Sequence, residues 1–547
     1  MSAPRRGNGT SVSRQSELAR VAREVFGWQR LRPAQLAAME AVLAGRDVLA
    51  VMATGSGKSA IYQVPAVLLD GATLVVSPLI ALQRDQISGL AARHAPEAVA
   101  INSQLTGDDL AHSWRAVREH EAEYVFLAPE QLTNDAVLAA LADMDISLVV
   151  VDEAHCVSAW GHDFRPSYLR IADAVERLGA APVVALTATA SPVVRREIVE
   201  HLRLRTPLVI ASGFDRPNIR LEVSHHVDDD DKRDAVLGRM LTVQRPALLY
   251  TATRRDAEMY AGQLNSSALR AMAYHAGLSR RRRDEVHRCF RGDEVDVVVA
   301  TSAFGMGIDK ADVRTVVHAS VPDSMDSYYQ QIGRAGRDGR PASTVLFYRA
   351  EDLALARFFT AHRPDEDLLA AVYSALDRRR PKNLAALRAE LAARGARLTN
   401  AVNLLEEAEL ARATRNGFIR CTDASTEEAV ARAVEIVEKG ERIDRTRVEM
   451  MRGYAETRDC RRQFLLSYFG EALPAPCGNC DNCDAGANRE RPVAGRWEVD
   501  AAVAHREWGP GVVMAVDDDR ITVLFDDYGY RTLLLEAIEH SGVLTRR

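Results

Sequence analysis

The sequence predicts an α/β protein with two parallel-sheet lobes, followed by a helical region, a cysteine-rich module and a small C-terminal β-barrel. Short apolar runs rich in β-branched residues alternate with helical stretches over about residues 35–211, and again over about 214–348. Apolar strands between amphipathic helices are typical of parallel sheets buried on both faces. After about residue 360 the chain becomes helix-rich. The stretch 498–547 has short strand-like runs separated by Gly, Pro and Asp turns, which predicts the barrel.

Composition is that of an ordinary globular protein. The 547 residues leave room for several domains, and 47% of them are hydrophobic and 27% charged. No run approaches the ~18 uninterrupted apolar residues of a membrane helix, so we expect no membrane association. Residues 1–16 are polar, lack the apolar core of a secretory signal, and are predicted to form a disordered tail. The net charge of −6 does not indicate nucleic-acid binding, although a locally basic channel is compatible with it.

The number of cysteines indicates the redox state of the cellular compartment. The chain has seven cysteines, of which Cys156, Cys289 and Cys421 are scattered. An odd count in a large chain without a signal sequence favours a reducing cytoplasm over a disulfide-forming compartment. The sequence therefore predicts a cytoplasmic protein.

A glycine-rich segment after the strand-like run VLAV carries the first chemistry. In MATGSGKSAIYQ (52–63), two glycines are followed by a lysine and a serine. Glycines let backbone N–H groups close on phosphates, the lysine reaches the β and γ oxygens, and the serine hydroxyl binds Mg²⁺. Met52 replaces the first glycine of the general pattern, so a plain glycine turn before a helix is the alternative. The predicted ATP and Mg²⁺ ligands of this loop are Thr54, Gly55, Ser56, Gly57, Lys58 and Ser59.

An acidic pair follows the strand-like run LVVV. Asp152 at this position can hold the metal together with the loop, and Glu153 can orient and deprotonate an attacking water. An isolated acidic pair would more often be a solvated strand end. Combined with the glycine-rich loop, the pair indicates nucleotide hydrolysis.

The second repeat offers two arginines in QQIGRAGRDG (330–339). Arg334 and Arg337 lie on a segment punctuated by glycines. Arginines from a second lobe that reach the γ-phosphate stabilise transition-state charge and couple hydrolysis to closure of the lobes. We therefore expect a two-lobed ATP-driven motor.

The segment after the acidic pair, CVSAWGHDFRPSY (156–168), contains three large aromatic residues. Trp160, Phe164 and Tyr168 lack the regular spacing of a core strand or helix, and they stand among residue types typical of loops. We expect these aromatics to be exposed. The alternative is that they pack underneath the loop.

The remaining cysteines form a group with the spacing C-x₁₆-C-x₂-C-x₂-C. Four thiolates suit tetrahedral zinc, and the short spacings favour a closed structural site. A disulfide pair is disfavoured in a reducing cytoplasm, and a redox C-x-x-C lacks its preceding strand. The predicted zinc ligands are Cys460, Cys477, Cys480 and Cys483.

The order of these motifs resembles the RecQ family of superfamily 2 DNA helicases over about residues 26–350 and 454–484. The motifs that carry the resemblance are FGWQRLRPAQ (26–35), MATGSGKS, SPLIALQRDQ (77–86), DEAH, LTATA (186–190), FDRPN (214–218), YHAGL (274–278), ATSAFGMGIDKADVR (300–314) and QQIGRAGRDG. One departure is Gln331, where the family usually has glutamate, and we expect its effect to be small. The resemblance implies RecA-like lobes.

The resemblance also implies roles for further residues. The segment 26–35 resembles the adenine-reading segment of the family, so Trp28 would stack on the base, with Arg32 and Gln35 at its edge. His155 completes the DEAH box and is expected to take part in catalysis.

The loop after the DEAH box resembles the family's aromatic-rich loop, which senses single-stranded DNA and couples it to hydrolysis. Bases stack on aromatic faces at roughly 1–3 kcal/mol each, independent of sequence. The residues expected to bind DNA and to couple it are Trp160, His162, Phe164 and Arg165.

The implied function is an ATP- and Mg²⁺-dependent 3′-to-5′ DNA helicase in recombination and repair, acting on single-stranded and duplex DNA. One alternative is a translocase or annealing factor that does not separate strands. Another is a binding scaffold with an inactive motor, which the presence of the catalytic residues disfavours.

Two regions depart from the usual family plan. Residues 384–421 are predicted to form two helices and a polar β-turn, either a winged helix placed before the zinc module or a plain helical hairpin. Residues 499–543 resemble the Tudor-like module at the C-terminus of UvrD/PcrA-type helicases, which docks on RNA polymerase. The acidic turns of this segment favour a protein partner over DNA, with Trp508 and Tyr528 as candidate anchors. A barrel that only packs on the motor is the alternative.

These considerations give the expected domain boundaries. They are a disordered tail (1–16), RecA-like ATP-binding lobe 1 (17–211), RecA-like lobe 2 (212–352), a winged-helix-like region (364–440), a zinc module (441–486), a linker (487–497) and a Tudor/SH3-like barrel (498–547).

Overall fold

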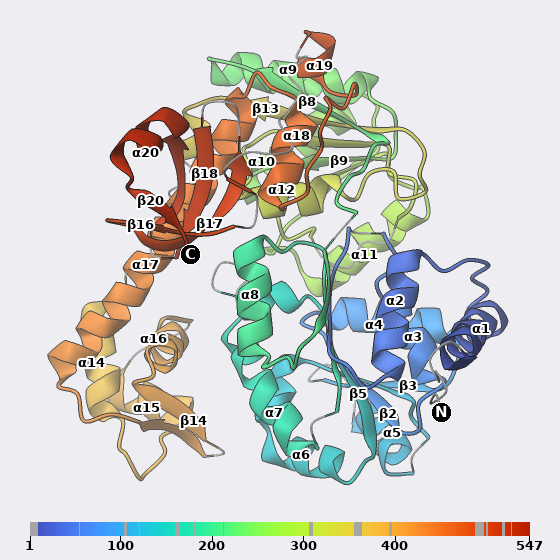
Figure 1. The fold of residues 1–547 in the computed structure, drawn as a ribbon, viewed down its shortest axis with the longest axis vertical. Coiled ribbons are helices and arrows are strands. Elements are labelled where there is room, and N and C mark those ends of the chain that lie inside the picture. The colour runs from blue at the N-terminus through green and yellow to red at the C-terminus, as the bar shows by residue number, and fades with distance from the viewer. Residues whose placement is uncertain are drawn as a thin grey trace, which may run out of the picture.

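The computed structural model describes residues 9–547 except for 54, 94, 103–106, 120, 159–164, 180, 212, 306–309, 355–363, 393–395, 415, 487–496, 499–500, 517–519 and 527. Two α/β lobes lie one above the other in Figure 1, with a helical region beside the lower lobe. The C-terminal sheet lies to the left of the upper lobe, above the lower lobe. Within the described residues, no helix combines the length and the apolar character that crossing a membrane requires.

Lobe 1 is a seven-stranded parallel sheet covered by helices, as predicted. Its strand order is β3 (Ala98–Ile101), β4 (Tyr124–Leu127), β2 (Ala72–Val76), β5 (Ile146–Val151), β6 (Val183–Thr187), β1 (Val48–Val51) and β7 (Leu208–Ala211). Its helices are α1 (Gly9–Glu24), α2 (Pro33–Leu43), α3 (Ala60–Ala66), α4 (Ile80–Ala91), α5 (Gly107–Arg118), α6 (Asp135–Ala142), α7 (Ile171–Arg177) and α8 (Pro192–His201). Three short 3₁₀ helices are η1 (Pro129–Thr133), η2 (Ala154–Val157) and η3 (Pro166–Arg170).

The N-terminal helix differs from expectation. α1 begins at Gly9, inside the stretch 1–16 for which a disordered tail was predicted, and residues 1–8 lie outside the described part. Leu18, Val21 and Phe26 are buried in the core that α2 and α3 share with the sheet. This apolar stripe stabilises the helix through tertiary packing, which composition alone does not reveal.

Lobe 2 is a six-stranded parallel sheet. Its strand order is β10 (Ala271–Tyr274), β11 (Val297–Ala300), β9 (Ala247–Tyr250), β12 (Thr315–His318), β13 (Ala342–Tyr348) and β8 (Ile219–His225). Its helices are α9 (Asp229–Thr242), α10 (Arg254–Ser266), α11 (Arg280–Arg291) and α12 (Met325–Ile332). The glycine-rich and acidic segments of lobe 1 follow the ends of β1 and β5, and the arginine-bearing segment of lobe 2 follows the end of α12.

The described part of residues 366–420 contains three helices and a β-hairpin. They are α14 (Glu366–Ala375), α15 (Leu384–Leu391), α16 (Ala396–Glu407), β14 (Ala411–Thr414) and β15 (Gly417–Arg420). Lys382 adds a bridge to Phe418, so a third segment extends the hairpin. An ion pair between Arg170 and Glu406 joins this region to lobe 1. The hairpin excludes the plain helical hairpin that the sequence left open.

A long helix connects this region to the zinc module and the C-terminal sheet. α17 (Thr426–Glu456) begins at a capping box formed by Ser425 and Glu428, and α18 (Arg461–Tyr468) and α19 (Asp481–Asp484) follow. The terminal sheet has the order β19 (Gly529–Leu534), β18 (Arg520–Phe525), β17 (Gly509–Val516), β16 (Ala502–His505) and β20 (Leu544–Arg546). α20 (Leu535–Ser541) lies between β19 and β20 in the chain.

The C-terminal segment forms an antiparallel sheet of short strands, but closure into the predicted barrel is not confirmed. Among the described residues no pairing joins the edge strands β19 and β20. One face carries Val513 and Phe525 into a core of its own with Ile538 of α20. The other face carries Met514 and Tyr530 into the core of the motor. The sheet therefore packs on the motor through residues of β17, β18 and β19 on this second face.

Candidate nucleotide-hydrolysing site and metal centre

The glycine-rich loop lies between β1 and α3, at the carboxyl edge of the lobe 1 sheet. Gly55 and Gly57 both have φ of +79°, a left-handed conformation that favours glycine. A Cβ atom on Gly57 would lie 2.7 Å from Nε2 of Gln35, so a side chain here would displace the Gln35 amide. The Gln35 amide donates hydrogen bonds to the carbonyls of Ser56 and Gly57, both at 3.0 Å. Thr54, also predicted for this loop, lies outside the described residues.

Lys58 points back into the loop. Its Nζ donates to the Met52 carbonyl at 3.0 Å. Burial lowers the pKa of Lys58, and the carboxylates of Glu153 and Asp152 oppose that shift. Ser59 is the residue directly before α3, and its side chain makes no capping hydrogen bond to the helix. The predicted phosphate-binding lysine is thus brought to the acidic pair.

The acidic pair ends β5 as predicted. Asp152 is buried, and its carboxylate accepts a hydrogen bond from Nε2 of Gln86 at 3.3 Å. Burial raises the pKa of Asp152 to about 7, the neighbouring Glu153 charge adds to this rise, and Lys58 opposes it. Glu153 has φ of +48°, which is uncommon for a residue with a side chain and occurs at functional sites where the surroundings impose it.

His155 connects the acidic pair to the end of β6. The imidazole is buried, with Nδ1 2.8 Å from Oγ1 of Thr187 and 3.3 Å from Oε2 of Glu153. The Thr187 hydroxyl in turn donates to the Thr189 carbonyl at 3.0 Å. His155 therefore connects the DEAH segment, which follows β5, to the LTATA segment at the end of the neighbouring strand β6.

Lobe 2 brings an arginine to the loop of lobe 1. A Cβ atom placed on Gly55 would lie 3.3 Å from Cγ of Arg337, so this side chain lies directly against the loop. The Arg337 charge also lowers the pKa of Lys58. Arg334 is buried and interacts with the hydroxyl of Tyr250 inside lobe 2. Of the two predicted arginines, Arg337 is the one that crosses the lobe boundary.

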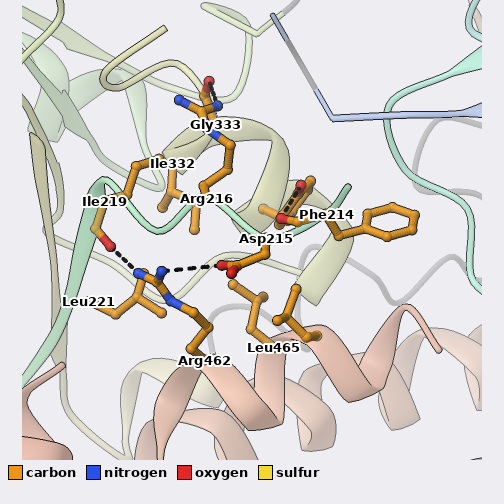
Figure 2. Close-up of a pocket in the computed structure, with 11 residues that line it drawn as sticks. Phe214, Asp215, Arg216, Ile219, Leu221, Ile332, Gly333, Arg462 and Leu465 are labelled. Atoms are coloured by element: carbon orange, nitrogen blue, oxygen red, sulfur yellow. Dashed lines mark hydrogen bonds and ion pairs between the residues drawn. The ribbon is translucent and has the colours of Figure 1, made fainter. Parts of the chain in front are cut away.

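The turn that carries these arginines is held by a residue that sequence reasoning did not single out. Arg216 donates to the carbonyls of Gly333 at 3.2 Å, Ala335 at 2.8 Å and Gly336 at 2.9 Å. Figure 2 shows Arg216 extending over this turn. Arg216 belongs to the motif FDRPN, but only the fold reveals that its guanidinium binds the backbone of the arginine turn.

The zinc module contacts the segment that carries Arg216. Arg462 of α18 pairs with Asp215 at 3.1 Å and donates to the Ile219 carbonyl, and both contacts are drawn in Figure 2. Arg462 is buried, whereas the Asp215 side chain is 32% exposed. Loss of Asp215 would therefore leave the buried Arg462 guanidinium without its charge partner.

The segment predicted to read adenine lies against the same loop. Trp28 stacks on Phe26 with ring centroids 4.8 Å apart and an interplanar angle of 16°. The backbone N–H of Arg32 donates to Oε1 of Gln35 at 2.8 Å. Gln35 thus uses both ends of its amide, the oxygen at Arg32 and the nitrogen at the glycine-rich loop.

The aromatic-rich segment is only partly described. Trp160, His162 and Phe164 lie outside the described residues, whereas Arg165 donates to the Pro78 carbonyl at 3.2 Å. Tyr168 was expected to be exposed, and this was wrong: it is completely buried. Its hydroxyl donates to the backbone carbonyl of Asp152 at 2.9 Å, because a buried phenol needs a hydrogen-bond partner.

The four clustered cysteines come together as predicted. Their sulfur atoms all lie within 4.8 Å of one another. The Sγ atoms of Cys477 and Cys483 are 3.9 Å apart, close to the ~3.8 Å that four tetrahedral ligands at ~2.3 Å from zinc would show. Backbone N–H groups point at the sulfurs, as at Asn479 to Cys477 (3.3 Å), which favours thiolates. All four thiols are free, so no disulfide competes with metal binding.

Three family models match this chain. Residues 32–197 match the DEAD/DEAH box helicase model, residues 231–339 match the helicase conserved C-terminal domain, and residues 422–484 match RecQ zinc-binding.

Curated relatives agree with these matches. The ATP-dependent DNA helicase RecQ of Pasteurella multocida (strain Pm70) is 34% identical over 461 residues, which cover 84% of this chain and 61% of the relative. The probable ATP-dependent DNA helicase RecS of Bacillus subtilis (strain 168) is 38% identical over 333 residues, covering 61% of this chain and 67% of the relative. The chain spans 61–65% of the length of the bacterial RecQ proteins that it matches.

A solved structure shares the fold. The DUF1998 helicase MrfA bound to DNA superposes with a TM-score of 0.52 at 16% identity, over 75% of this chain and 60% of that one.

Proposed function

The chain belongs to the RecQ helicase family, and from this premise we propose that it is an ATP- and Mg²⁺-dependent DNA helicase. We propose that it moves 3′ to 5′ on single-stranded DNA and separates duplex DNA in recombination and repair. The observation that carries this proposal is the contact of Arg337 with Gly55, because one nucleotide site is then completed by both lobes. Opening and closing of such a site can drive movement along a strand.

The residues of lobe 1 receive roles from their positions. Lys58 would bind the β- and γ-phosphate oxygens of ATP, with the backbone N–H groups of the glycine-rich loop around it. Ser59 and Asp152 would hold Mg²⁺, which supplies charge neutralisation at the transferred phosphoryl group. Glu153 would orient the attacking water and accept its proton. Its contact with His155 supports a role for His155 in fixing the position of this carboxylate.

The residues of lobe 2 would act on the transition state. Arg337 would stabilise the charge that develops on the γ-phosphate, since it already lies against the loop. Arg334 is more deeply placed and would hold the turn through its contact with Tyr250. Arg216 supports both by binding the backbone carbonyls of the same turn.

Base recognition is assigned to the segment before the loop. Trp28 would stack on adenine, and Arg32 and Gln35 would contact its edge. The stack of Trp28 on Phe26 supports this, because it fixes the orientation of the indole. The Gln35 nitrogen also binds the glycine-rich loop. Binding of the base to Gln35 would therefore directly affect the loop that binds the phosphates.

DNA coupling is assigned to the loop after the DEAH segment. Trp160, His162, Phe164 and Arg165 would contact single-stranded DNA, with bases stacking on the aromatic faces. The bond from Tyr168 to the Asp152 carbonyl supports this role, since it links the end of the loop to the metal-binding residue.

The remaining modules have supporting roles in this proposal. Zn²⁺ held by Cys460, Cys477, Cys480 and Cys483 would fix α18 against lobe 2. We propose that residues 364–440 form a winged-helix-like domain, supported by the order of three helices and a hairpin. We also propose that the sheet within 498–547 offers its exposed Tyr528 to a protein partner, RNA polymerase by its resemblance to Tudor-like modules. The free state of all seven cysteines supports a cytoplasmic location.

A strand-displacement assay with 3′-tailed, 5′-tailed and forked duplexes tests the function. We expect ATP-dependent separation of the 3′-tailed and forked substrates, and none of the 5′-tailed one. Lys58→Ala serves as the inactive control. DNA-stimulated ATP hydrolysis without strand separation on any substrate would instead identify a translocase or annealing factor, and ATP binding without hydrolysis would identify a scaffold.

A further inference from the structure

The segment SPLIALQRDQ (77–86) ends in two adjacent residues of α4 that contact different parts of the molecule. Asp85 pairs with Arg291 of α11, with 2.5 Å between Oδ2 of the aspartate and Nη2 of the arginine. In Figure 1, α11 lies at the edge of lobe 2 that faces lobe 1, above α4. The ion pair is therefore a direct contact between the lobes, separate from the contact of Arg337 with the glycine-rich loop.

Gln86, the next residue, contacts the nucleotide site. Its Nε2 donates to Oδ2 of Asp152 at 3.3 Å, and its Oε1 accepts a hydrogen bond from the Tyr62 hydroxyl. Tyr62 is buried in α3, which begins directly after the glycine-rich loop. The Gln86 amide thus connects the helix that follows the phosphate-binding loop to the carboxylate that would hold Mg²⁺.

The N-terminal turn of α4 is attached to the sheet through Gln83. The Gln83 side chain is buried, and its Nε2 donates at 2.9 Å to the carbonyl of Ser77, the residue directly after β2. Its Oε1 accepts a hydrogen bond at 3.1 Å from Nδ2 of Asn102, which directly follows β3. Asp85 and Gln86 lie two and three residues further on, together in the next part of the helix. A shift of Asp85 therefore displaces Gln86 as well, while the start of α4 stays attached to the sheet.

The two contacts of this part of α4 differ in exposure. The side chains of Asp85 and Arg291 are 34% and 44% exposed, so their ion pair can break without leaving a buried charge. Asp152, in contrast, is buried. A buried carboxylate that loses a hydrogen-bond donor is destabilised, because water does not replace the donor. The exposed ion pair can thus form and break as the lobes close and open, whereas the Gln86 contact determines how Asp152 is held.

We propose that α4 transmits closure of the lobes to the metal-binding carboxylate. The Asp85–Arg291 pair holds this part of α4 in the closed state, and Gln86 is a positioning residue that orients Asp152. The proposal rests on the proposed ATP-driven function, because it concerns the same site. It gives lobe 2 an effect on Asp152 in addition to the direct action of Arg337 on the γ-phosphate.

The ion pair is tested by exchanging its two side chains in the full-length protein. Asp85→Arg and Arg291→Asp should each lower the DNA-stimulated kcat for ATP about fivefold, near the largest effect of one exposed ion pair, with KM within about twofold of wild type. The double variant restores opposite charges and should recover kcat to within about twofold of wild type. Arg282→Asp is the matched control, because it reverses a charge of the same helix at an arginine that pairs with Glu285 inside α11.

Gln86→Ala tests the connection to Asp152. It should lower kcat about fivefold, the effect of one lost hydrogen bond. Asp85→Arg should have no further effect in this background, because the ion pair acts through Gln86. The affinity for a fluorescent nonhydrolysable ATP analogue, with Mg²⁺ and with EDTA, provides a measurement without turnover. Gln86→Ala should match wild type in EDTA and bind the analogue about threefold more weakly than wild type with Mg²⁺, since Asp152 is no longer oriented.

The outcomes separate the inference from the function. Wild-type kcat in both single charge variants, a double variant no faster than either, or an equal loss in Arg282→Asp would overturn the role of the ion pair. Additive losses from Gln86→Ala and Asp85→Arg would overturn the connection through Gln86. A lower thermal midpoint with wild-type kcat and an unchanged effect of Mg²⁺ would show that the contacts are structural only. Absence of ATP hydrolysis in wild type and in Arg282→Asp would instead refute the proposed function, and the inference with it.

Discussion

Arg337 of lobe 2 lies against Gly55 of lobe 1, so that a Cβ atom on the glycine would be 3.3 Å from Cγ of the arginine. The two residues are the closest point of the second lobe to the phosphate-binding loop among the contacts described above. Their proximity means that the loop conformation and the approach of the arginine are not independent. A change at the glycine should therefore affect hydrolysis in a way that a distant glycine does not.

Gly55→Ala tests this dependence. Alanine at φ of +79° is strained by about 1 kcal/mol, and its methyl group would also press on the Arg337 side chain. We expect DNA-stimulated ATP hydrolysis to fall at least about tenfold, the effect of ~1.4 kcal/mol on a barrier. Gly45→Ala is the control, because Gly45 has a similar φ of +72° and no atom within 4 Å of its virtual Cβ. Equal losses in the two variants would show that only backbone strain matters.

Substitutions of Lys58 and Glu153 should separate ATP binding from ATP hydrolysis. Lys58→Ala should abolish hydrolysis, because Lys58 is the lysine of the glycine-rich loop that would bind the β- and γ-phosphate oxygens. Glu153→Gln should still bind ATP but lower kcat by about two orders of magnitude or more, as expected when a general base is removed. Binding of a fluorescent ATP analogue and steady-state ATPase rates measure the two effects. DNA-stimulated hydrolysis near wild type in either variant would contradict the assigned roles.

Local patterns predicted much of this site, because the chemistry depends on residues close together in sequence. The strand-like run VLAV, the glycines after it and the spacing of Cys477, Cys480 and Cys483 each define a short backbone geometry. Both lobes, the acidic pair at the end of β5 and the cysteine cluster followed from such patterns. The hairpin near Gly417 was also indicated locally, by turn residues between two polar runs.

Contacts between distant segments could not be predicted in the same way. Arg216 binds carbonyls more than 100 residues away, at sequence separations of 117 to 120, and nothing in FDRPN specifies those partners. Tyr168 looked exposed because its neighbours are loop residues, but its hydroxyl partner is a backbone carbonyl, which leaves no trace in a sequence. The second buried face of the C-terminal sheet was missed for a related reason. Alternation indicates which residues share a face, but not whether a partner covers it.

Zinc removal should weaken the contact between α18 of the zinc module and lobe 2. The free energy of metal binding is folding free energy for a module as small as α18 and the cysteine loop. Cys480→Ser should therefore lower soluble yield and weaken the contact of Arg462 with Asp215, whereas Cys421→Ser, at an exposed free cysteine, should not. Metal analysis should find about one zinc per wild-type chain. Purified wild-type protein without zinc would refute the site.

The departure at Gln331 gives a prediction about pH. Nε2 of His318 lies 2.7 Å from Oε1 of Gln331, and the rings of Tyr250 and Tyr328 flank the imidazole. Burial lowers the pKa of His318 to about 4, and the hydrogen bond with Gln331 opposes that shift. The neutral amide at position 331 therefore matches a histidine that stays uncharged inside lobe 2.

The sign of the pH effect follows from proton binding. An unfolded histidine titrates near ~6.5, so between that pH and about 4 the unfolded chain binds a proton that folded His318 does not bind. Stability should fall by about 3 kcal/mol as the pH drops through this window, and His318 should contribute no pH dependence above it. Gln331→Glu places a carboxylate beside the imidazole, raises its pKa and should flatten this dependence. Urea midpoints at pH 7 and pH 5 measure the difference, with Gln330→Glu as the control on the same helix. If the two variants lose stability in parallel between these pH values, His318 does not set the pH dependence of lobe 2.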